Sequence, residues 1–111
     1  MTSINAHGLS LWEAARAMGI EVYEEASPID REVQTEGLRL HYLDWGNEDL
    51  PPLLLLHGGF QTAHSWDFVA LALRDRYHVI ALDQRGHGDS DWAVDGDYSR
   101  EAHQKDIEGF F

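Results

Sequence analysis

Two glycines follow the most apolar run of the sequence, in the segment His57-Gly58-Gly59-Phe60. Acyl-transfer chemistry places negative charge on a carbonyl oxygen, and backbone N–H groups aimed at that oxygen stabilise the charge. Such groups must come close to the substrate, which favours residues without side chains, such as Gly58 and Gly59. The same pair could simply turn the chain at the end of a strand, and spacing alone does not separate these two interpretations.

A second group of polar residues closes the next apolar segment, in the sequence Asp83-Gln84-Arg85-Gly86-His87-Gly88-Asp89-Ser90. Gly86 and Gly88 allow a sharp reversal of the chain. Asp83, Arg85 and Ser90 are residue types that hold such a loop by hydrogen bonds. The segment therefore predicts a sharp turn held by local hydrogen bonds.

Patterns for other chemistries are missing from the sequence. It has no Cys, which excludes disulfides and thiolate metal sites. Asp91 stands where a dinucleotide fingerprint needs its third glycine, and no G-x-x-x-x-G-K-[ST] motif occurs. We therefore expect no cofactor. We also expect no metal, because four histidines lack ligand spacing and suit loop or surface positions instead: His57, His64, His78 and His87.

The elements around the two motifs form a strand-helix-strand unit. Leu53–Leu56 is apolar on both faces, which predicts a strand covered by helices on either side. The period becomes helical from Ser65 to Arg76, and Tyr77–Leu82 is a second apolar strand. The two strands should be parallel, with a right-handed crossover. The helix should bury one side, formed by Trp66, Val69, Ala70 and Leu73.

An antiparallel hairpin should precede this unit. Glu32–Glu36 and Leu38–Asp44 are the predicted strands, with Gly37 in the turn between them. In the second strand, Leu38, Leu40 and Tyr42 alternate with Arg39, His41 and Leu43.

Helices are predicted near both ends of the chain. Ser10 and Glu13 fit a capping box for a helix that runs through Met18 and stops at Gly19. Its apolar face would be Leu11, Ala14, Ala15 and Met18. Ser99 would cap a last helix that runs through Ile107.

Composition narrows the class of protein. A chain of 111 residues is one small domain at most. Its 20 acidic and 8 basic residues give a charge of −12, which argues against binding nucleic-acid phosphates. No stretch resembles a secretory signal, and the apolar runs are too short to cross a membrane. We therefore expect a soluble, cytoplasmic protein that does not bind membranes.

The two motifs, in this order and about 26 residues apart, resemble those of the α/β-hydrolase family. The resemblance covers Glu32 to Phe111 and implies the N-terminal part of an α/β-hydrolase sandwich. In this α/β fold an antiparallel strand pair leads into a mostly parallel sheet flanked by helices. Residues 1–31 would be an N-terminal helical extension, and residues 32–111 a partial hydrolase domain.

The resemblance also implies roles for site residues. The oxyanion donor of the family falls on Gly59, with Phe60 as the neighbouring candidate. His57 would be a packed, hydrogen-bonded loop residue and not a general base. The loops near the active site would be architectural, through His57, Gly58, Asp83, Arg85, Gly86, Gly88 and Ser90.

No residue of the chain fits the nucleophile that the family places in a G-x-S-x-G elbow. Among the six serines only Ser90 comes close, with Trp92 at the position of the last glycine. We therefore expect the nucleophile (Ser or Asp), its acid and the catalytic His to lie beyond Phe111, and the chain alone to be inactive.

The function implied is hydrolysis of a small organic ester or a related substrate. Just after His-Gly, epoxide hydrolases of the family usually have Pro and haloalkane dehalogenases a polar residue followed by Pro. Gly59-Phe60 departs from both patterns. The alternative is a non-catalytic binding or assembly module with a truncated hydrolase fold. In either case the Leu53–Leu56 strand would leave a sheet edge open to self-association or to pairing with a partner.

Overall fold

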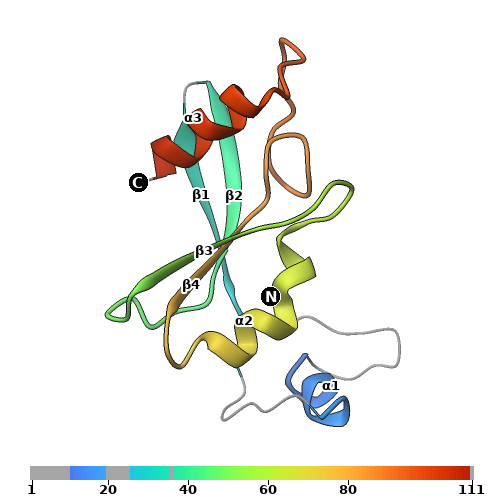
Figure 1. The fold of residues 1–111 in the computed structure, drawn as a ribbon, viewed down its shortest axis with the longest axis vertical. Coiled ribbons are helices and arrows are strands. Elements are labelled where there is room, and N and C mark those ends of the chain that lie inside the picture. Colours follow the sequence, from blue (N-terminus) through green and yellow to red (C-terminus); the bar gives the residue numbers. More distant parts are fainter. Residues whose placement is uncertain (1–10, 20–25, 36, 111) are drawn as a thin grey trace.

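The computed structural model describes residues 11–19, 26–35 and 37–110 (Figure 1). Ser10 of the predicted capping box and the side chains of Leu11 and Ala15 lie outside the described part. In chain order the elements are α1 (Leu11–Ala17), β1 (Ile29–Thr35), β2 (Leu38–Asp44), β3 (Pro52–Leu56), a 3₁₀ helix η1 (Ala63–Trp66), α2 (Asp67–Leu73), β4 (His78–Leu82) and α3 (Arg100–Phe110).

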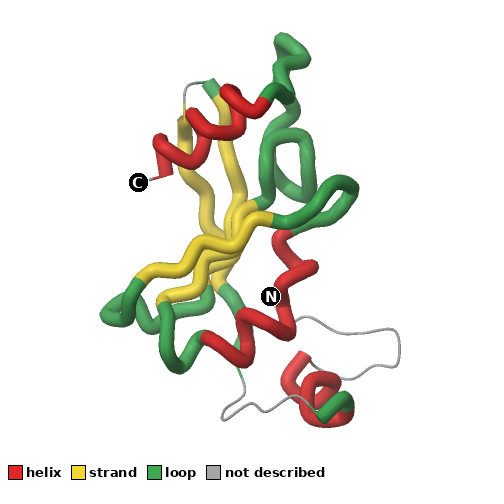
Figure 2. Tube along the Cα trace, in the orientation of Figure 1, coloured by secondary structure: helices red, strands yellow, loops and turns green. Residues whose placement is uncertain are grey.

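The four strands form one mixed sheet in the order β1-β2-β4-β3 (Figure 2). The β1–β2 hairpin is antiparallel and β3 pairs with β4 in parallel, as the sequence predicts. β2 also pairs antiparallel with β4. β1 begins at Ile29, three residues before the predicted start, so it reaches into the segment expected to be a helical extension.

Helices cover opposite faces of the sheet. Leu43 of β2 lies in the main core with Ala70 and Leu71 of α2. The neighbouring Tyr42 instead contacts Phe110 of α3, with ring centroids 4.7 Å apart. Adjacent residues of a strand point to opposite faces, so α2 and α3 lie on different sides of β2. The layered α/β arrangement expected from the sequence is therefore confirmed.

Cover on both faces changes the burial pattern of β2. Leu38 and Leu40 from one of the two alternating sets are buried, and so are His41 and Leu43 from the other. Both faces of this strand are therefore covered, and Arg39 is its one exposed residue. The largest fully buried side chains are Trp45, Leu40, Leu43, Leu82 and Val79.

The strand β3 is less covered than its sequence suggested. Leu53 and Leu55 pack against the core, but Leu56 is 37% exposed. β3 lies at the edge of the described sheet and is paired there only with β4. The prediction of a strand buried on both faces is thus wrong for the described residues, because among the described helices only η1 contacts β3, whereas α3 packs against β1.

Helix boundaries differ from the predictions in detail. The helix expected from Ser65 to Arg76 is split into η1, with a Thr62 capping box, and the shorter α2. Val69 is 42% exposed and Met18 66% exposed, so neither belongs to the buried face assigned to it. Ser99 caps α3 as predicted, accepting a 3.1 Å bond from the Ala102 N–H.

β4 begins at His78, one residue after the predicted start. Tyr77 is not part of β4 and is 38% exposed. Gly19 follows α1 with φ +79°, the left-handed conformation of a helix stop. Among the described helices, none has the length and apolar character needed to cross a bilayer.

Candidate functional site

The loop after β3 is organised by the buried ring of His57. Its Nδ1 lies 2.8 Å from the carbonyl oxygen of Gly58, and its Nε2 lies 3.0 Å from the backbone N–H of Gln84. Because that N–H can only donate, Nε2 accepts and the proton sits on Nδ1, which donates to Gly58. The carbonyl of His57 in turn accepts a 2.7 Å bond from Nε2 of the Gln84 side chain. Both ring nitrogens are therefore engaged.

Beyond His57 the loop turns outward. The Gly58 N–H donates to Oε1 of Gln61 at 3.0 Å. A Cβ built on Gly59 would meet nothing within 4 Å, so open space surrounds it. Phe60 has φ +61°, a strained conformation for a bulky residue, and its side chain is fully exposed. Within the described residues, neither the Gly59 nor the Phe60 N–H has a hydrogen-bond acceptor.

The loop after β4 is tied to its neighbours by the buried carboxylate of Asp83. Its Oδ1 accepts a 2.7 Å bond from the Ala63 N–H at the start of η1. Its Oδ2 lies 2.6 Å from Nδ1 of His41 on β2 and 3.0 Å from the Asp89 N–H. Gly88 has φ +50°, and a Cβ there would overlap this carboxylate. Asp83 therefore holds three segments together.

Ser90 closes the same loop and is buried. Its hydroxyl donates to the carbonyl of Asp83 and accepts a 2.8 Å bond from the His41 N–H. The oxygen is thus engaged on both sides and shielded from substrate. This geometry agrees with an architectural role for Ser90.

Arg85 points away from the His57 loop, toward α3. Its guanidinium pairs with both carboxylate oxygens of Asp106 and donates to the Asp97 carbonyl at 2.7 Å. The pairing with Asp106 raises the pKa of Arg85 further above its usual value. Gly86 has φ +77°, and a Cβ there would collide with the Tyr98 ring.

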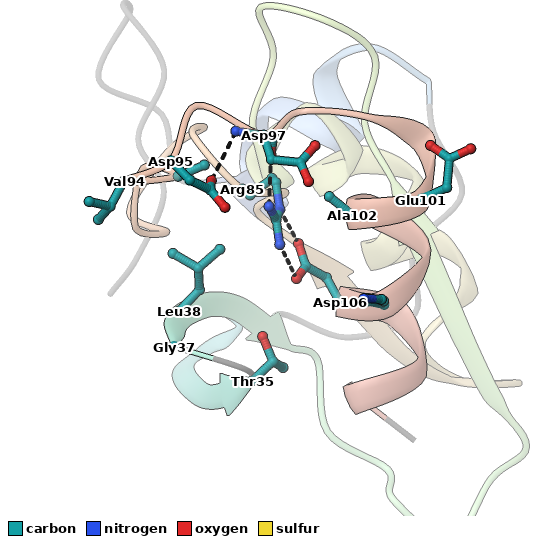
Figure 3. Close-up of a pocket in the computed structure, with 12 residues that line it drawn as sticks. Thr35, Gly37, Leu38, Arg85, Val94, Asp95, Asp97, Glu101, Ala102 and Asp106 are labelled. Carbon is teal, nitrogen blue, oxygen red and sulfur yellow. Dashed lines mark hydrogen bonds and ion pairs between the residues drawn. The ribbon is translucent and has the colours of Figure 1, made fainter.

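A cleft of about 400 Å³ lies beside this ion pair, between the β1–β2 turn, the loop before α3 and α3 itself (Figure 3). Leu38 and Val94 contribute apolar surface to it, and Asp95 and Asp97 contribute carboxylates. None of the residues of the His57 loop lines it. The described cleft and the candidate oxyanion loop are therefore separate features.

His41 is a buried titratable group that the sequence did not reveal. Its Nε2 lies 2.7 Å from Asp30 on β1 and its Nδ1 lies 2.6 Å from Asp83. Burial opposes the charge, but the hydrogen bonds to the two carboxylates outweigh it and raise the pKa of His41. The bond to His41 lowers the pKa of Asp30.

Metal-ligating groups come together at one place in the described part of the chain. Ligand atoms of His41, Asp83 and Asp89 lie within 4.8 Å of one another. Both ring nitrogens of His41 are bonded to carboxylates, and Asp83 also accepts two backbone N–H groups. Hydrogen bonding accounts for this cluster without an ion.

The remaining histidines predicted as loop or surface residues also have partners, although His78 is a partly buried residue of β4, so the prediction was wrong for it. Nδ1 of His64 lies 2.8 Å from Asp67, which raises the pKa of His64. His78 lies 3.0 Å from Asp44. The rings of His57 and His87 are 4.9 Å apart, so the two motif loops meet at this point.

Comparison with known proteins decides the family. A family model described as alpha/beta hydrolase fold matches residues 51–111. The chain belongs to the α/β-hydrolase fold family. Both motif loops and α3 lie within the matched segment.

The relatives of this α/β-hydrolase chain include proteins named as epoxide hydrolases and as esterases. Epoxide hydrolase A of Mycobacterium tuberculosis is 43% identical over 65 residues, which are 58% of this chain and 20% of the relative. An esterase of the same organism is 40% identical over 65 residues, 59% of this chain and 21% of the relative. The chain therefore spans about a fifth of the length of these curated relatives.

A solved structure gives the same result for the fold. The epoxide hydrolase from Acinetobacter nosocomialis superimposes with a TM-score of 0.71 at 29% identity, over 90% of this chain and 31% of that one. The coverage shows that the similarity includes the hairpin before residue 51.

Four residues of the site region were missed by reasoning from sequence. Gln61 and Gln84 are ordinary polar residues beside the motifs, with no pattern that marks their partners. His41 stood in an alternating strand that looked half-exposed. Asp106 lies 21 residues from Arg85 in the sequence. The one sign of its burial was that it falls one helical turn after Ala102, which is also buried in α3.

Proposed function

We propose that this chain supplies the oxyanion loop of an α/β-hydrolase that acts on a small organic ester, with Gly59 and Phe60 as N–H donors. The supporting observation is the Gly59 N–H, which follows the carboxyl end of β3, is exposed and has no acceptor within the described residues. Ester hydrolysis builds charge on a carbonyl oxygen. Loss of one such donor typically lowers kcat by about 10²–10³.

The nucleophile, its acid and the catalytic His are proposed to come from residues outside these 111. The sequence has no G-x-S-x-G, and Ser90, which comes nearest to it, is buried with its oxygen engaged on both sides. We therefore expect the chain alone to be inactive. This proposal leaves Ser and Asp nucleophiles open.

An ester is favoured over an epoxide by the residues after His57. Epoxide hydrolases of the family usually carry Pro just after His-Gly, whereas this chain has Gly59-Phe60. The names of the relatives include both activities, so they support the family and not the choice of substrate. The exposed ring of Phe60 and the 37% exposed side chain of Leu56 provide apolar surface for the substrate.

The test uses a serine-directed fluorophosphonate probe and intact-mass spectrometry. The 111-residue chain should give no adduct. A longer product, extended by any coding sequence after Phe111, should be labelled on a downstream serine and hydrolyse p-nitrophenyl acetate faster than styrene oxide. An adduct on the short chain would overturn the proposal, and preferred epoxide opening would overturn the ester assignment.

A binding or assembly module is the second candidate, because β3 lies at the edge of the described sheet with half-exposed leucines. Pairing through this edge should appear as a concentration-dependent dimer in sedimentation. Leu54→Lys should abolish it, since a charge in the middle of the strand opposes edge pairing. A monomer at all concentrations would exclude self-association.

A further inference from the structure

We infer that Gln61 and Gln84 are positioning residues that act on the direction of the Gly59 N–H through the preceding peptide group: their side chains hold the His57–Gly58 peptide, one by accepting and the other by donating a hydrogen bond, and the ring of the His57 placed in this way holds the Gly58 carbonyl. The inference rests on the proposed function, because the direction of the Gly59 N–H matters only if that group is an oxyanion donor. The geometry itself rests on contacts within two consecutive peptide groups of the loop.

The first peptide group joins His57 to Gly58, and a glutamine side chain holds each of its ends. Its carbonyl accepts from Nε2 of Gln84 at 2.7 Å. Its N–H donates to Oε1 of Gln61 at 3.0 Å. An amide side chain can serve either purpose, but here each glutamine uses one specific end of its amide. The two side chains therefore fix the rotation of this plane.

The second peptide group joins Gly58 to Gly59, and only its carbonyl is held. That oxygen accepts from Nδ1 of His57 at 2.8 Å and from the Gln61 N–H at 3.3 Å. The described peptide bonds are all trans, so the N–H of the same plane points the opposite way. Bonds to the Gly58 carbonyl thus set the direction of the Gly59 N–H, which leaves the loop toward open space.

Glycine makes these bonds necessary. Gly58 and Gly59 have no side chains to restrict rotation, so an unheld loop would sample many directions of the N–H. Gln84 lies in the second motif loop and Gln61 in the first, so the donor direction is shared between both loops. This explains why the two loops must meet for an oxyanion donor to be preorganised.

The test uses the fact that position 61 needs a hydrogen-bond acceptor and position 84 needs a hydrogen-bond donor. Gln61→Glu keeps an acceptor for the Gly58 N–H, whereas Gln61→Met removes it. At the other position Gln84→Met removes the donor, and Gln84→Glu places a carboxylate against the His57 carbonyl. Gln34→Met is the matched control, because Gln34 is exposed on β1 and its side chain has no hydrogen bond within the described residues.

The measurements are Gly58 amide exchange and the Gly59 N–H residual dipolar coupling in the ¹⁵N-labelled 111-residue chain. Gln61→Met should speed exchange of the Gly58 amide by roughly 3- to 10-fold, as expected for one lost hydrogen bond. Gln61→Glu and the Gln34→Met control should not change it. The Gly59 coupling should shrink in Gln61→Met and Gln84→Met, shrink most in Gln84→Glu, and persist in Gln61→Glu.

These results distinguish a positioning role from a packing role. If the two glutamines only filled space, Glu and Met would have similar effects at each position, because their side chains are similar in size. Equal effects of Glu and Met at position 61, or no effect of Glu at position 84, would overturn the inference. These readouts need no catalysis, so they are independent of the probe experiment above.

In a longer active product, Gln84→Glu should lower kcat at least 10-fold with little change in KM. An unchanged kcat together with a displaced Gly59 coupling would overturn the oxyanion role alone.

Discussion

Arg85 and Asp106 form a two-pronged ion pair that joins the loop after β4 to the middle of α3. Nε of Arg85 lies 2.7 Å from Oδ2 of Asp106, and Nη2 lies 2.8 Å from Oδ1. The side chains are only 10% and 6% exposed, so both charges have lost most of their water. Each charge therefore depends on the other, and the pair determines where α3 packs against the loop.

Removing one charge of this pair should be costly. Asp106→Asn leaves the Arg85 guanidinium buried without its counter-charge, and we expect the free energy of unfolding to fall by about 3 kcal/mol. Urea denaturation measures this change. Glu108→Gln on the exposed side of α3 is the control and should change stability by less than about 0.5 kcal/mol. The double variant Arg85→Met/Asp106→Leu should recover part of the loss. A double-variant loss equal to the sum of the losses in Arg85→Met and Asp106→Leu would show that the charges act separately.

The turn around Gly88 should be intolerant of a side chain. Gly88→Ala combines a left-handed backbone, at about 1–2 kcal/mol, with overlap between the new Cβ and the Asp83 carboxylate, at about 1–3 kcal/mol. We expect a total loss of about 3 kcal/mol in thermal or urea unfolding. Gly96→Ala is the matched control, because Gly96 has φ +72° but nothing within 4 Å of the new Cβ. Similar losses in both variants would mean that backbone strain alone decides.

The order of helices and strands along the chain was predictable, because patterns of neighbouring residues agree with the fold. Leu38–Asp44 alone was predicted to the residue. The Ser99 cap and the Gly37 hairpin also follow from short-range chemistry. Such features depend on a few neighbouring residues. The sequence therefore predicted the elements, their order and the two motif loops.

Burial and long-range polar pairing were not predictable in the same way. β3 was expected to be covered by helices on both faces, yet that cover depends on where distant helices pack, which no local pattern records. His41 was assigned to an alternating strand, but its polar partners are Asp30 on β1 and Asp83 in the loop after β4, which no local pattern connects to it. The contacts of Gln61 and Gln84 likewise arise only when two loops meet.

The raised pKa of His41 should make the free energy of unfolding depend on pH. Its folded pKa is raised above 6.5, so the stabilisation is fully present below about pH 6.5 and is lost as pH rises through the folded pKa. Asp30→Asn removes one of the two carboxylates that favour the imidazolium. It should lower the pKa of His41 in an NMR titration and flatten the fall in unfolding free energy at high pH.

His103 is the internal control for that titration. Burial lowers the pKa of His103, and no hydrogen bond to Asp30 contributes to this shift. Its titration should therefore stay unchanged in Asp30→Asn. If His41 titrated at or below its ordinary value in the unsubstituted chain, the two carboxylates would not be holding a charged ring.

Phe60 should store strain that a glycine releases. The residue has φ +61° and its ring is fully exposed, so substitution loses little packing. Phe60→Gly removes about 1–2 kcal/mol of strain from the left-handed backbone. It also raises the entropy of the unfolded chain, which lowers stability by roughly 0.4–1 kcal/mol. We expect the free energy of unfolding to rise by about 0.5–1 kcal/mol in urea denaturation. Val94→Gly is the control, since Val94 is equally exposed without a positive φ, and it should lower stability instead. If both glycine variants lost stability equally, the Phe60 backbone would not be strained, and the loop would owe its shape to the ring.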